Sequence, residues 1–292
     1  ACAAAPTPVP SAPMWFDTPA IRALIDLGLT EDVGSGDTAT EATIAAATQG
    51  SAVVRAKEDL IVCGGPMFAA VMRRIDPAVE VTQLIAEGTE AHPGDVVLQL
   101  RGPLRGILVG ERPALNFLGR MSGIATFARA CADAVAGTAT RVVDTRKTLP
   151  AYRSLDKYAV RTGGCSNHRT ALDAGVMIKE NHIAACGSLA VAIGAAKERA
   201  SHLIRIEVEI ERIEQLEEVL AAGADVVLLD NMSNDQMRAC VALNGGRAIL
   251  EASGNMTLER LAGVAATGVD FISMGALTHT VKNADLSLRV AP

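Results

Sequence analysis

Short runs of apolar and β-branched residues recur through the second half of the chain, separated by stretches with helical spacing or loop composition. The runs lie at about 142–144, 176–179, 204–209, 225–229, 248–252 and 270–274. Strands that alternate with helices form parallel sheets, because each helix returns the chain to the start of the next strand. We therefore predict an α/β fold whose second domain, residues 129–278, is an incomplete TIM-like barrel of about six parallel strands.

The first half shows a different pattern, in which short apolar runs are joined by Gly and Pro turns. A helix is expected around residues 18–28, and strand composition is found in SAVVRAKEDLIVCGG, VEVTQLI and DVVLQLRGPLRGILVG. We predict an N-terminal α+β open-sandwich domain over residues 14–128. The C-terminal residues 279–292 are expected to rejoin this domain.

A long helix is predicted to link the two halves. We expect it to begin within GERPALNFLGRMSGIATFARACADAVAG, with Pro113 in its first turn. Leu115, Leu118, Ile124 and Phe127 then form an apolar stripe along one side.

Composition narrows the class of protein. The chain has 292 residues, 49% of them hydrophobic, but no apolar run is long enough to cross a bilayer, so we expect no membrane partner. Residues 1–13 are rich in Ala and Pro and lack a basic start, which predicts a disordered tail rather than a secretory signal. Six scattered cysteines without a C-x-x-C motif favour reduced thiols and a cytoplasmic protein.

Charge is unevenly distributed along the sequence. The formal net charge is −6, which argues against a nucleic-acid partner because such binding normally needs a basic face. Residues 141–182 nevertheless contain eight Lys or Arg against four Asp or Glu, a local excess of +4. A cationic site in an acidic protein predicts a small polyanionic ligand.

Cationic side chains follow the first two predicted barrel strands. Arg146 and Lys147 come after the first strand, Lys179 closes the second, and His168 and Arg169 lie in the Gly-rich segment between them. The carboxyl ends of barrel strands form the face where active sites are built. Arginine binds carboxylates through two parallel hydrogen bonds and lysine suits phosphate, so a substrate with several anionic groups is expected.

Acidic and small residues follow the later strands. Glu207 and Glu209 alternate with one apolar residue, so both carboxylates face the same side of a strand, about 7 Å apart. Asp230 ends the next strand, and such carboxylates beside a phosphate site suit Mg²⁺. EASGN and SMGAL place small residues after the last two strands, where backbone N–H groups can bind phosphate.

The ordered motifs DTRKTLP, GGCSNHR, VMIKENHI, IEVE, VVLLDN, EASGN and TGVDFISMGALTH together resemble the quinolinate phosphoribosyltransferases, the decarboxylating nicotinate-nucleotide pyrophosphorylases. The resemblance runs from about Thr30 to Ser287. It implies a type II phosphoribosyltransferase that converts quinolinate and phosphoribosyl pyrophosphate to nicotinate mononucleotide, pyrophosphate and CO₂ in NAD biosynthesis. It also implies an N-terminal sandwich, an incomplete barrel and a homodimer in which the sandwich of one subunit covers the barrel mouth of the other.

The resemblance also implies roles for individual residues. Arg112 is similar to the arginine that reaches the neighbouring subunit's site, and Arg146, His168 and Arg169 resemble the pocket for the quinolinate carboxylates. Lys147 and Lys179 resemble the lysines that contact the phosphoribosyl donor, and Glu209 and Asp230 the acids that face its ribose and Mg²⁺–pyrophosphate. The remaining substrate-binding residues expected are Thr145 and the 5′-phosphate loops Ser253, Gly254, Asn255, Met274, Gly275 and Ala276.

Two departures from the family pattern and two alternatives stand beside this assignment. Ala151-Tyr152 replaces the usual Gly-Leu pair, and Asn255 occupies a position that is Gly in some members. A paralogue for another aromatic acid is disfavoured by the intact cationic cluster. A catalytically silent metabolite-binding protein is disfavoured by the retained lysines and acids.

Overall fold

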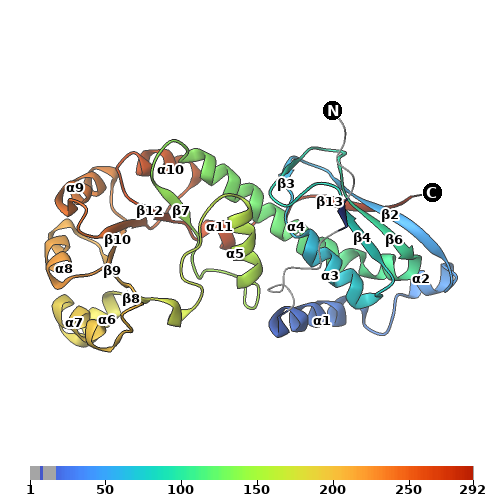
Figure 1. Ribbon diagram of the computed structural model, residues 1–292, viewed down its shortest axis with the longest axis horizontal. Helices are drawn as coiled ribbons and strands as arrows, with labels where there is room; N and C mark the ends of the chain where they lie inside the picture. The colour runs from blue at the N-terminus through green and yellow to red at the C-terminus, as the bar shows by residue number, and fades with distance from the viewer. Residues whose placement is uncertain (1–6, 9–17, 292) are drawn as a thin grey trace. The chain divides into compact units, whose positions relative to one another are not determined.

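The computed structural model describes residues 7–8 and 18–291 of the chain. The chain forms two compact units (Figure 1). The first comprises Ala1–Phe127 with Val281–Pro292, and the second comprises Ala128–Thr280. None of the helices among the described residues combines the length and apolarity that a membrane span requires.

An antiparallel five-stranded sheet organises the first unit. Its order is β1-β4-β6-β2-β13, built from Thr7–Pro8, Glu80–Gln83, Val96–Pro103, Gln49–Ala56 and Leu286–Ala291. In β2, Ala52, Val54 and Ala56 are fully buried and alternate with more exposed residues, as expected for a sheet with one face on the core. The last strand of the chain, β13, pairs with β2 and so returns to the first unit.

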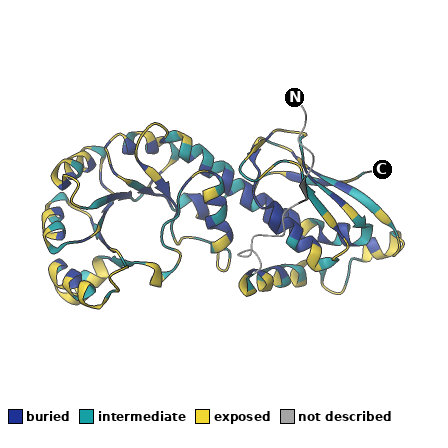
Figure 2. Cartoon of the chain, viewed as in Figure 1, coloured by how far each residue is buried: buried dark blue, intermediate teal, exposed yellow. Residues whose placement is uncertain are grey.

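Side chains cap the first two helices of the first unit, at Thr18 and Asp37. The unit contains α1 (Pro19–Val33), α2 (Thr38–Thr43), α3 (Gly65–Ile75) and the short strand pair β3 (Leu60–Ile61) with β5 (Glu90–Ala91). The Thr18 side chain accepts a hydrogen bond from Ile21 N–H at 3.3 Å, which caps α1. Met67, Phe68 and Met72 of α3 are fully buried in the core. Figure 2 shows the buried segments of each unit in dark blue.

The predicted disordered tail is wrong at two positions. Thr7–Pro8 form β1, in which Thr7 lies opposite Gln83 and Pro8 opposite Thr82. β1 pairs with the edge of β4 that β6 does not occupy. Proline is tolerated in such an edge strand because only one side of the strand forms backbone hydrogen bonds. The other residues of the predicted tail lie outside the described residues.

The long helix α4 (Leu104–Ala134) begins earlier than predicted. Leu104 directly follows β6, so LRGILVG is helical rather than part of a strand, and Pro113 lies inside the helix instead of in its first turn. Ile107, Ala114 and Leu118 are fully buried with helical spacing, which explains the correction. Pro113 lacks an N–H, so the Val109 carbonyl has no i→i+4 donor there.

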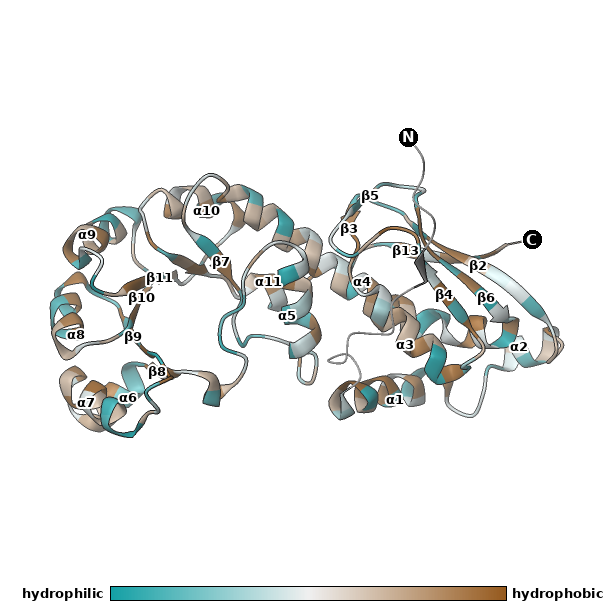
Figure 3. Cartoon of the chain, viewed as in Figure 1, coloured by the Kyte–Doolittle hydropathy of each residue, from teal (hydrophilic) through white to brown (hydrophobic). Residues whose placement is uncertain are grey.

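A six-stranded parallel sheet organises the second unit and confirms the predicted open barrel. Its order is β7-β12-β11-β10-β9-β8, built from Arg141–Val143, Phe271–Ser273, Ile249–Ser253, Val226–Asp230, Ile206–Ile210 and Val176–Ile178. Most residues of these strands are hydrophobic, with hydrophilic positions in β7 and β9 (Figure 3). Around them lie α5 (Arg153–Thr162), α6 (Glu180–Cys186), α7 (Leu189–Arg199), α8 (Leu216–Ala222), α9 (Asn234–Asn244), α10 (Leu258–Ala265) and α11 (Ala276–His279), with 3₁₀ turns at Leu172–Ala174 and Ile213–Gln215.

Strand register brings the polar strand ends together. Leu228 of β10 lies opposite Glu209 of β9 and Glu251 of β11, so these two acids share a layer of the sheet. Asp230 lies opposite Ser253 two residues further along the same pair of strands. Because all strands run in one direction, their carboxyl ends form a single rim.

Candidate active site

A cavity of about 870 Å³ opens at the carboxyl ends of the barrel strands. It is lined by Thr145, Arg146, Lys147, His168, Arg169, Met177, Lys179, Glu209, Leu228, Asp230, Asn231, Glu251, Ser253, Gly254, Asn255, Met256, Thr257, Ser273, Gly275, Ala276 and His279. The predicted site residues of the barrel, except Met274, therefore meet in one cavity. The cations and the acids that were singled out on separate strands line the same space.

Two predicted site residues lie elsewhere. Met274 has a side chain that is 1% exposed, with its Sδ atom 3.8 Å from Cys131 Sγ in the core of the second unit. Arg112 belongs to the first unit and lines a separate cavity of about 450 Å³ there, together with Asp32 and Asp37. The sequence motif around Met274 located the loop correctly, but this side chain points into the core.

Several lining residues were missed from the sequence. Glu251 is 4% exposed in the middle of β11, and Asn231 follows Asp230 with a φ of 55°. A charged residue within an otherwise apolar strand was an available signal for Glu251. Ser273 and His279 carry no comparable sequence signal.

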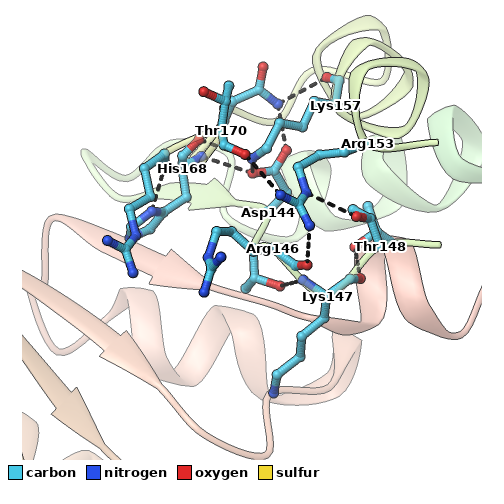
Figure 4. Close-up of polar contacts among 12 residues, drawn as sticks. Asp144, Arg146, Lys147, Thr148, Arg153, Lys157, His168 and Thr170 are labelled. Atoms are coloured by element: carbon cyan, nitrogen blue, oxygen red, sulfur yellow. Dashed lines mark hydrogen bonds and ion pairs between the residues drawn. The ribbon is translucent and has the colours of Figure 1, made fainter. Parts of the chain in front are cut away.

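A buried ion pair organises the loop after β7. Asp144 is fully buried and forms a close ion pair with Lys157, whose side chain is 5% exposed (Figure 4). The Asp144 carboxylate also accepts hydrogen bonds from His168 N–H at 2.9 Å and from the Asn167 side-chain amide at 2.6 Å. Lys157 donates to the His168 carbonyl at 3.0 Å. These contacts fix the backbone of residues 167–168 against the end of β7.

Arg146 and Arg169 present like charges to the cavity. The pKa of Arg169 is lowered by burial and by the positive charge of Arg146, so the two guanidinium groups destabilise each other's charge. One Arg169 nitrogen donates to the Gly175 carbonyl at 2.8 Å. Two neighbouring guanidinium groups could each donate two parallel hydrogen bonds to a carboxylate of a ligand.

His168 lies between two buried acids. Its Nε2 atom is 3.3 Å from Glu207 Oε2 and 3.5 Å from Glu251 Oε1. Burial lowers the pKa of His168, but the contacts with Glu207 and Glu251 outweigh it and raise that pKa to about 10. The pKa of Glu207 is raised mainly by burial. Sequence reasoning assigned Glu207 no specific role, and the structure places it directly against His168.

His168, Glu207 and Glu251 have the composition of a metal site, with ligand atoms within 4.8 Å of one another. Whether His168 can bind a metal ion through Nε2 depends on the protonation of its ring. His168 Nδ1 accepts a hydrogen bond from Arg169 N–H at 2.7 Å, which favours a neutral ring with its proton on Nε2. The raised pKa favours the doubly protonated ring instead. In both states Nε2 carries a proton directed at the two acids, so a metal ion could bind there only by displacing that proton.

The acids at the carboxyl ends of β9 and β10 lie near lysines. Lys179 Nζ forms a close ion pair with Glu209 Oε2. The pKa of Asp230 is raised by burial and by Glu209, and lowered in part by Lys179 and Lys147. Glu209 and Asp230 are therefore close enough to repel each other, and oxygen ligands in such a pair suit a divalent cation such as Mg²⁺.

The two Gly loops come very close to neighbouring groups. A Cβ atom on Gly254 would lie 2.2 Å from Asn231 Oδ1 and 2.8 Å from the Asn231 backbone N, and its φ is +88°. A Cβ atom on Gly275 would lie 3.0 Å from Lys147 Cδ. The departures from the family pattern noted in the sequence, Ala151 and Asn255, both have positive φ, 66° and 47°. Only glycine fits at Gly254 without displacing the loop.

The fold and the cavity define an α/β barrel protein with a cavity lined by basic and acidic side chains at the carboxyl ends of its strands. The sequence matches the quinolinate phosphoribosyl transferase C-terminal domain over residues 124–289 and the N-terminal domain of the same name over residues 37–122. The chain belongs to the quinolinate phosphoribosyltransferase family.

Named relatives extend over nearly the whole chain. A Bacillus subtilis protein named probable nicotinate-nucleotide pyrophosphorylase [carboxylating] is 42% identical, covering 92% of this chain and 93% of the relative. A Mycobacterium leprae protein named nicotinate-nucleotide pyrophosphorylase [carboxylating] is 39% identical, covering 92% of this chain and 96% of the relative. The solved structure of NadC from Streptococcus pyogenes superposes with a TM-score of 0.90 and 38% identity, covering 93% of this chain and 96% of that one.

Proposed function

We propose that this protein transfers the phosphoribosyl group of phosphoribosyl pyrophosphate to the nitrogen of quinolinate, with loss of CO₂ and pyrophosphate, to form nicotinate mononucleotide. The observation that carries the proposal is that Arg146, Arg169, Lys147 and Lys179 share one cavity with Glu209 and Asp230. Relatives about 40% identical are named for this reaction. The product is an intermediate of NAD biosynthesis.

Arg146 and Arg169 are assigned to the two carboxylates of quinolinate. Each guanidinium can donate two parallel hydrogen bonds to a carboxylate, which fixes both the position and the orientation of the ring. Binding of a dianion also relieves the repulsion between the two arginines. His168 borders the same region, but both its nitrogens already contact protein groups, so its contribution is to shape and charge this end of the cavity.

Lys147, Lys179, Glu209 and Asp230 are assigned to the phosphoribosyl donor. As pyrophosphate leaves, positive charge develops on C1 of the ribose, and the carboxylates of Glu209 and Asp230 stabilise it. The lysines neutralise the phosphate oxygens, and the backbone of the Ser253–Asn255 and Gly275–Ala276 loops is assigned to the 5′-phosphate. Attack by the ring nitrogen makes the pyridine cationic. When the adjacent carboxylate departs as CO₂, the electron pair of the broken bond stays on the ring carbon beside the positive nitrogen, which stabilises it, and a proton from water then completes the product.

Magnesium is proposed as the cofactor, with Glu209 and Asp230 as the residues that bind it directly or through water. Support comes from the raised pKa of Asp230, which burial and the neighbouring Glu209 carboxylate cause together. When bound, Mg²⁺ supplies positive charge that neutralises the pyrophosphate leaving group.

A homodimer with Arg112 acting in trans is proposed from the family resemblance. Mixing Arg112→Ala with Lys179→Ala subunits should restore part of the activity that each variant lacks, because some hybrid sites contain neither substitution. Failure to recover activity after verified subunit exchange would count against the shared site. A cytoplasmic location stays a prediction from the scattered cysteines, and plant relatives are named as chloroplastic and mitochondrial.

The reaction is tested by measuring pyrophosphate and CO₂ released from quinolinate, phosphoribosyl pyrophosphate and Mg²⁺. Equal amounts of the two products are expected. Pyrophosphate release with another aromatic acid, but not with quinolinate, would indicate a paralogue. Ligand binding without either product would indicate a silent binding protein.

A further inference from the structure

One side chain outside the cavity connects the two loops that carry its arginines. Arg153, at the start of α5, donates from Nε to Thr148 Oγ1 at 3.1 Å and from Nη2 to the Arg146 carbonyl at 3.3 Å. Its Nη1 donates to the Thr170 carbonyl at 3.2 Å (Figure 4). The first two acceptors lie in the loop after β7 and the third follows Arg169. The Arg153 guanidinium therefore links the two loops through three hydrogen bonds.

These loops need a connection because they carry like charges. Arg146 and Arg169 repel each other, as the lowered pKa of Arg169 indicates. Beyond the single bridge between Val143 and Ser166, neither loop is part of a regular strand among the described residues. The distance between the two guanidinium groups is therefore not set by the sheet.

Different contacts keep these loops folded and set the spacing between them. The inner part of the loops is fixed by the buried Asp144–Lys157 pair, which contacts residues 167 and 168. Arg153 is half-buried and contacts other parts of the loops, at Thr148, Thr170 and the Arg146 carbonyl. Loss of the Arg153 contacts should therefore change the loop spacing while the buried pair keeps the loops folded.

We propose that Arg153 is a positioning residue that fixes the separation of Arg146 and Arg169 and thereby makes the cavity selective for an acid with two adjacent carboxylates. This inference rests on the proposed function. A lysine cannot replace the arginine, because one ammonium group does not reach three acceptors in the planar geometry of a guanidinium. The selectivity arises because a monocarboxylate needs only one of the two arginines, whereas a vicinal diacid needs both at the right distance.

The test compares Arg153→Lys with Arg161→Lys, a matched control that is exposed on the same helix. Binding of pyridine-2,3-dicarboxylate and pyridine-2-carboxylate is measured by calorimetry, and kcat and KM are measured for both substrates. In Arg153→Lys we expect the KM for the diacid to rise about tenfold and the preference for the diacid over the monoacid to fall about tenfold. The KM for phosphoribosyl pyrophosphate should stay within about threefold of that of the wild type. Arg161→Lys should change none of these values.

Thr148→Val gives a second, independent variant, because it removes one acceptor of Arg153 and leaves every charge in place. It should shift the preference in the same direction by a smaller factor. Equal weakening of both acids, or an unchanged preference in two folded variants, would overturn the inference. If the wild-type protein itself fails to bind the diacid, the proposed function fails instead, so the two outcomes are distinguishable.

Discussion

At the scale of single residues, the site depends on charged groups whose partners are other charged groups. His168 lies against Glu207 and Glu251, and Lys179 lies against Glu209. Such pairs keep a cavity ready for anionic ligands while limiting the cost of leaving its charges unpaired. Their titration therefore affects stability as well as binding.

We predict that His168 stabilises the protein more at low pH than at high pH. Its pKa is about 10 in the folded protein, above the ordinary value, because contacts with Glu207 and Glu251 outweigh burial. The folded state thus binds the proton more tightly, so the gain is complete below about pH 6.5 and is lost as pH rises through about 10. The free energy of unfolding is measured with urea at about pH 6.5 and about pH 10. Between these two pH values it should decrease by about 1–3 kcal/mol more in the wild type than in His168→Gln.

His202→Gln provides the control, because His202 is exposed in the same unit. Its stability should follow the wild-type pH dependence. Parallel curves for wild type and His168→Gln would contradict the raised pKa.

The sequence located most site residues because one rule governs them: polar side chains at the carboxyl ends of parallel strands converge. That rule found Arg146, Lys179, Glu209 and Asp230. It could not find the contact of His168 with Glu207 and Glu251, because which of two acids on a strand meets a given histidine depends on strand register and barrel closure. The partner of Asp144 was unpredictable for the same reason, since Lys157 lies on a helix thirteen residues away.

At the scale of elements, the barrel and the linking helix were predictable, but the start of that helix was not. Six apolar runs marked the strands, since a strand buried on both faces is continuously apolar. The start of α4 was misplaced because LRGILVG is apolar enough to suit either a strand or a buried helix, and Pro113 suggested a helix start that the structure does not use. Short apolar runs leave this ambiguity unless the burial spacing is known.

The loop after β11 supplies the prediction at this scale. Gly254→Ala should weaken binding of phosphoribosyl pyrophosphate, because its Cβ would overlap Asn231 Oδ1 and the Asn231 backbone. We expect the KM for this substrate to rise at least about tenfold and the unfolding free energy to fall by about 2 kcal/mol. Steady-state kinetics and urea unfolding measure the two effects.

Gly187→Ala is the matched control for the loop prediction. Gly187 has a φ of +93°, close to that of Gly254, but a Cβ there would meet no atom within 4 Å. Both variants share the cost of a positive φ, so the difference between them isolates the close approach to Asn231. Equal effects on the KM would show that backbone conformation alone, and not this contact, shapes the loop.

At the scale of the whole molecule, the order of the chain makes the first unit depend on residues that follow the barrel. The sheet of the first unit includes β13, which lies after the entire second unit in the sequence. The core of the first unit is therefore incomplete until the chain end is available. Pairing of such distant segments carries a loop-closure cost that packing must exceed.

We therefore predict that Leu288→Asp destabilises the first unit selectively. Leu288 is 6% exposed and lies opposite the fully buried Val54, so the substitution removes apolar contacts and buries a charge, at a cost of about 3 kcal/mol or more. Hydrogen exchange measured by mass spectrometry should show faster exchange in β2 and β6, with β9–β11 unchanged. Arg289→Asp is the control, because Arg289 is the next residue of β13 and is exposed. It should leave hydrogen exchange slow in both units. Equal acceleration in both units would instead show that they unfold as one cooperative body.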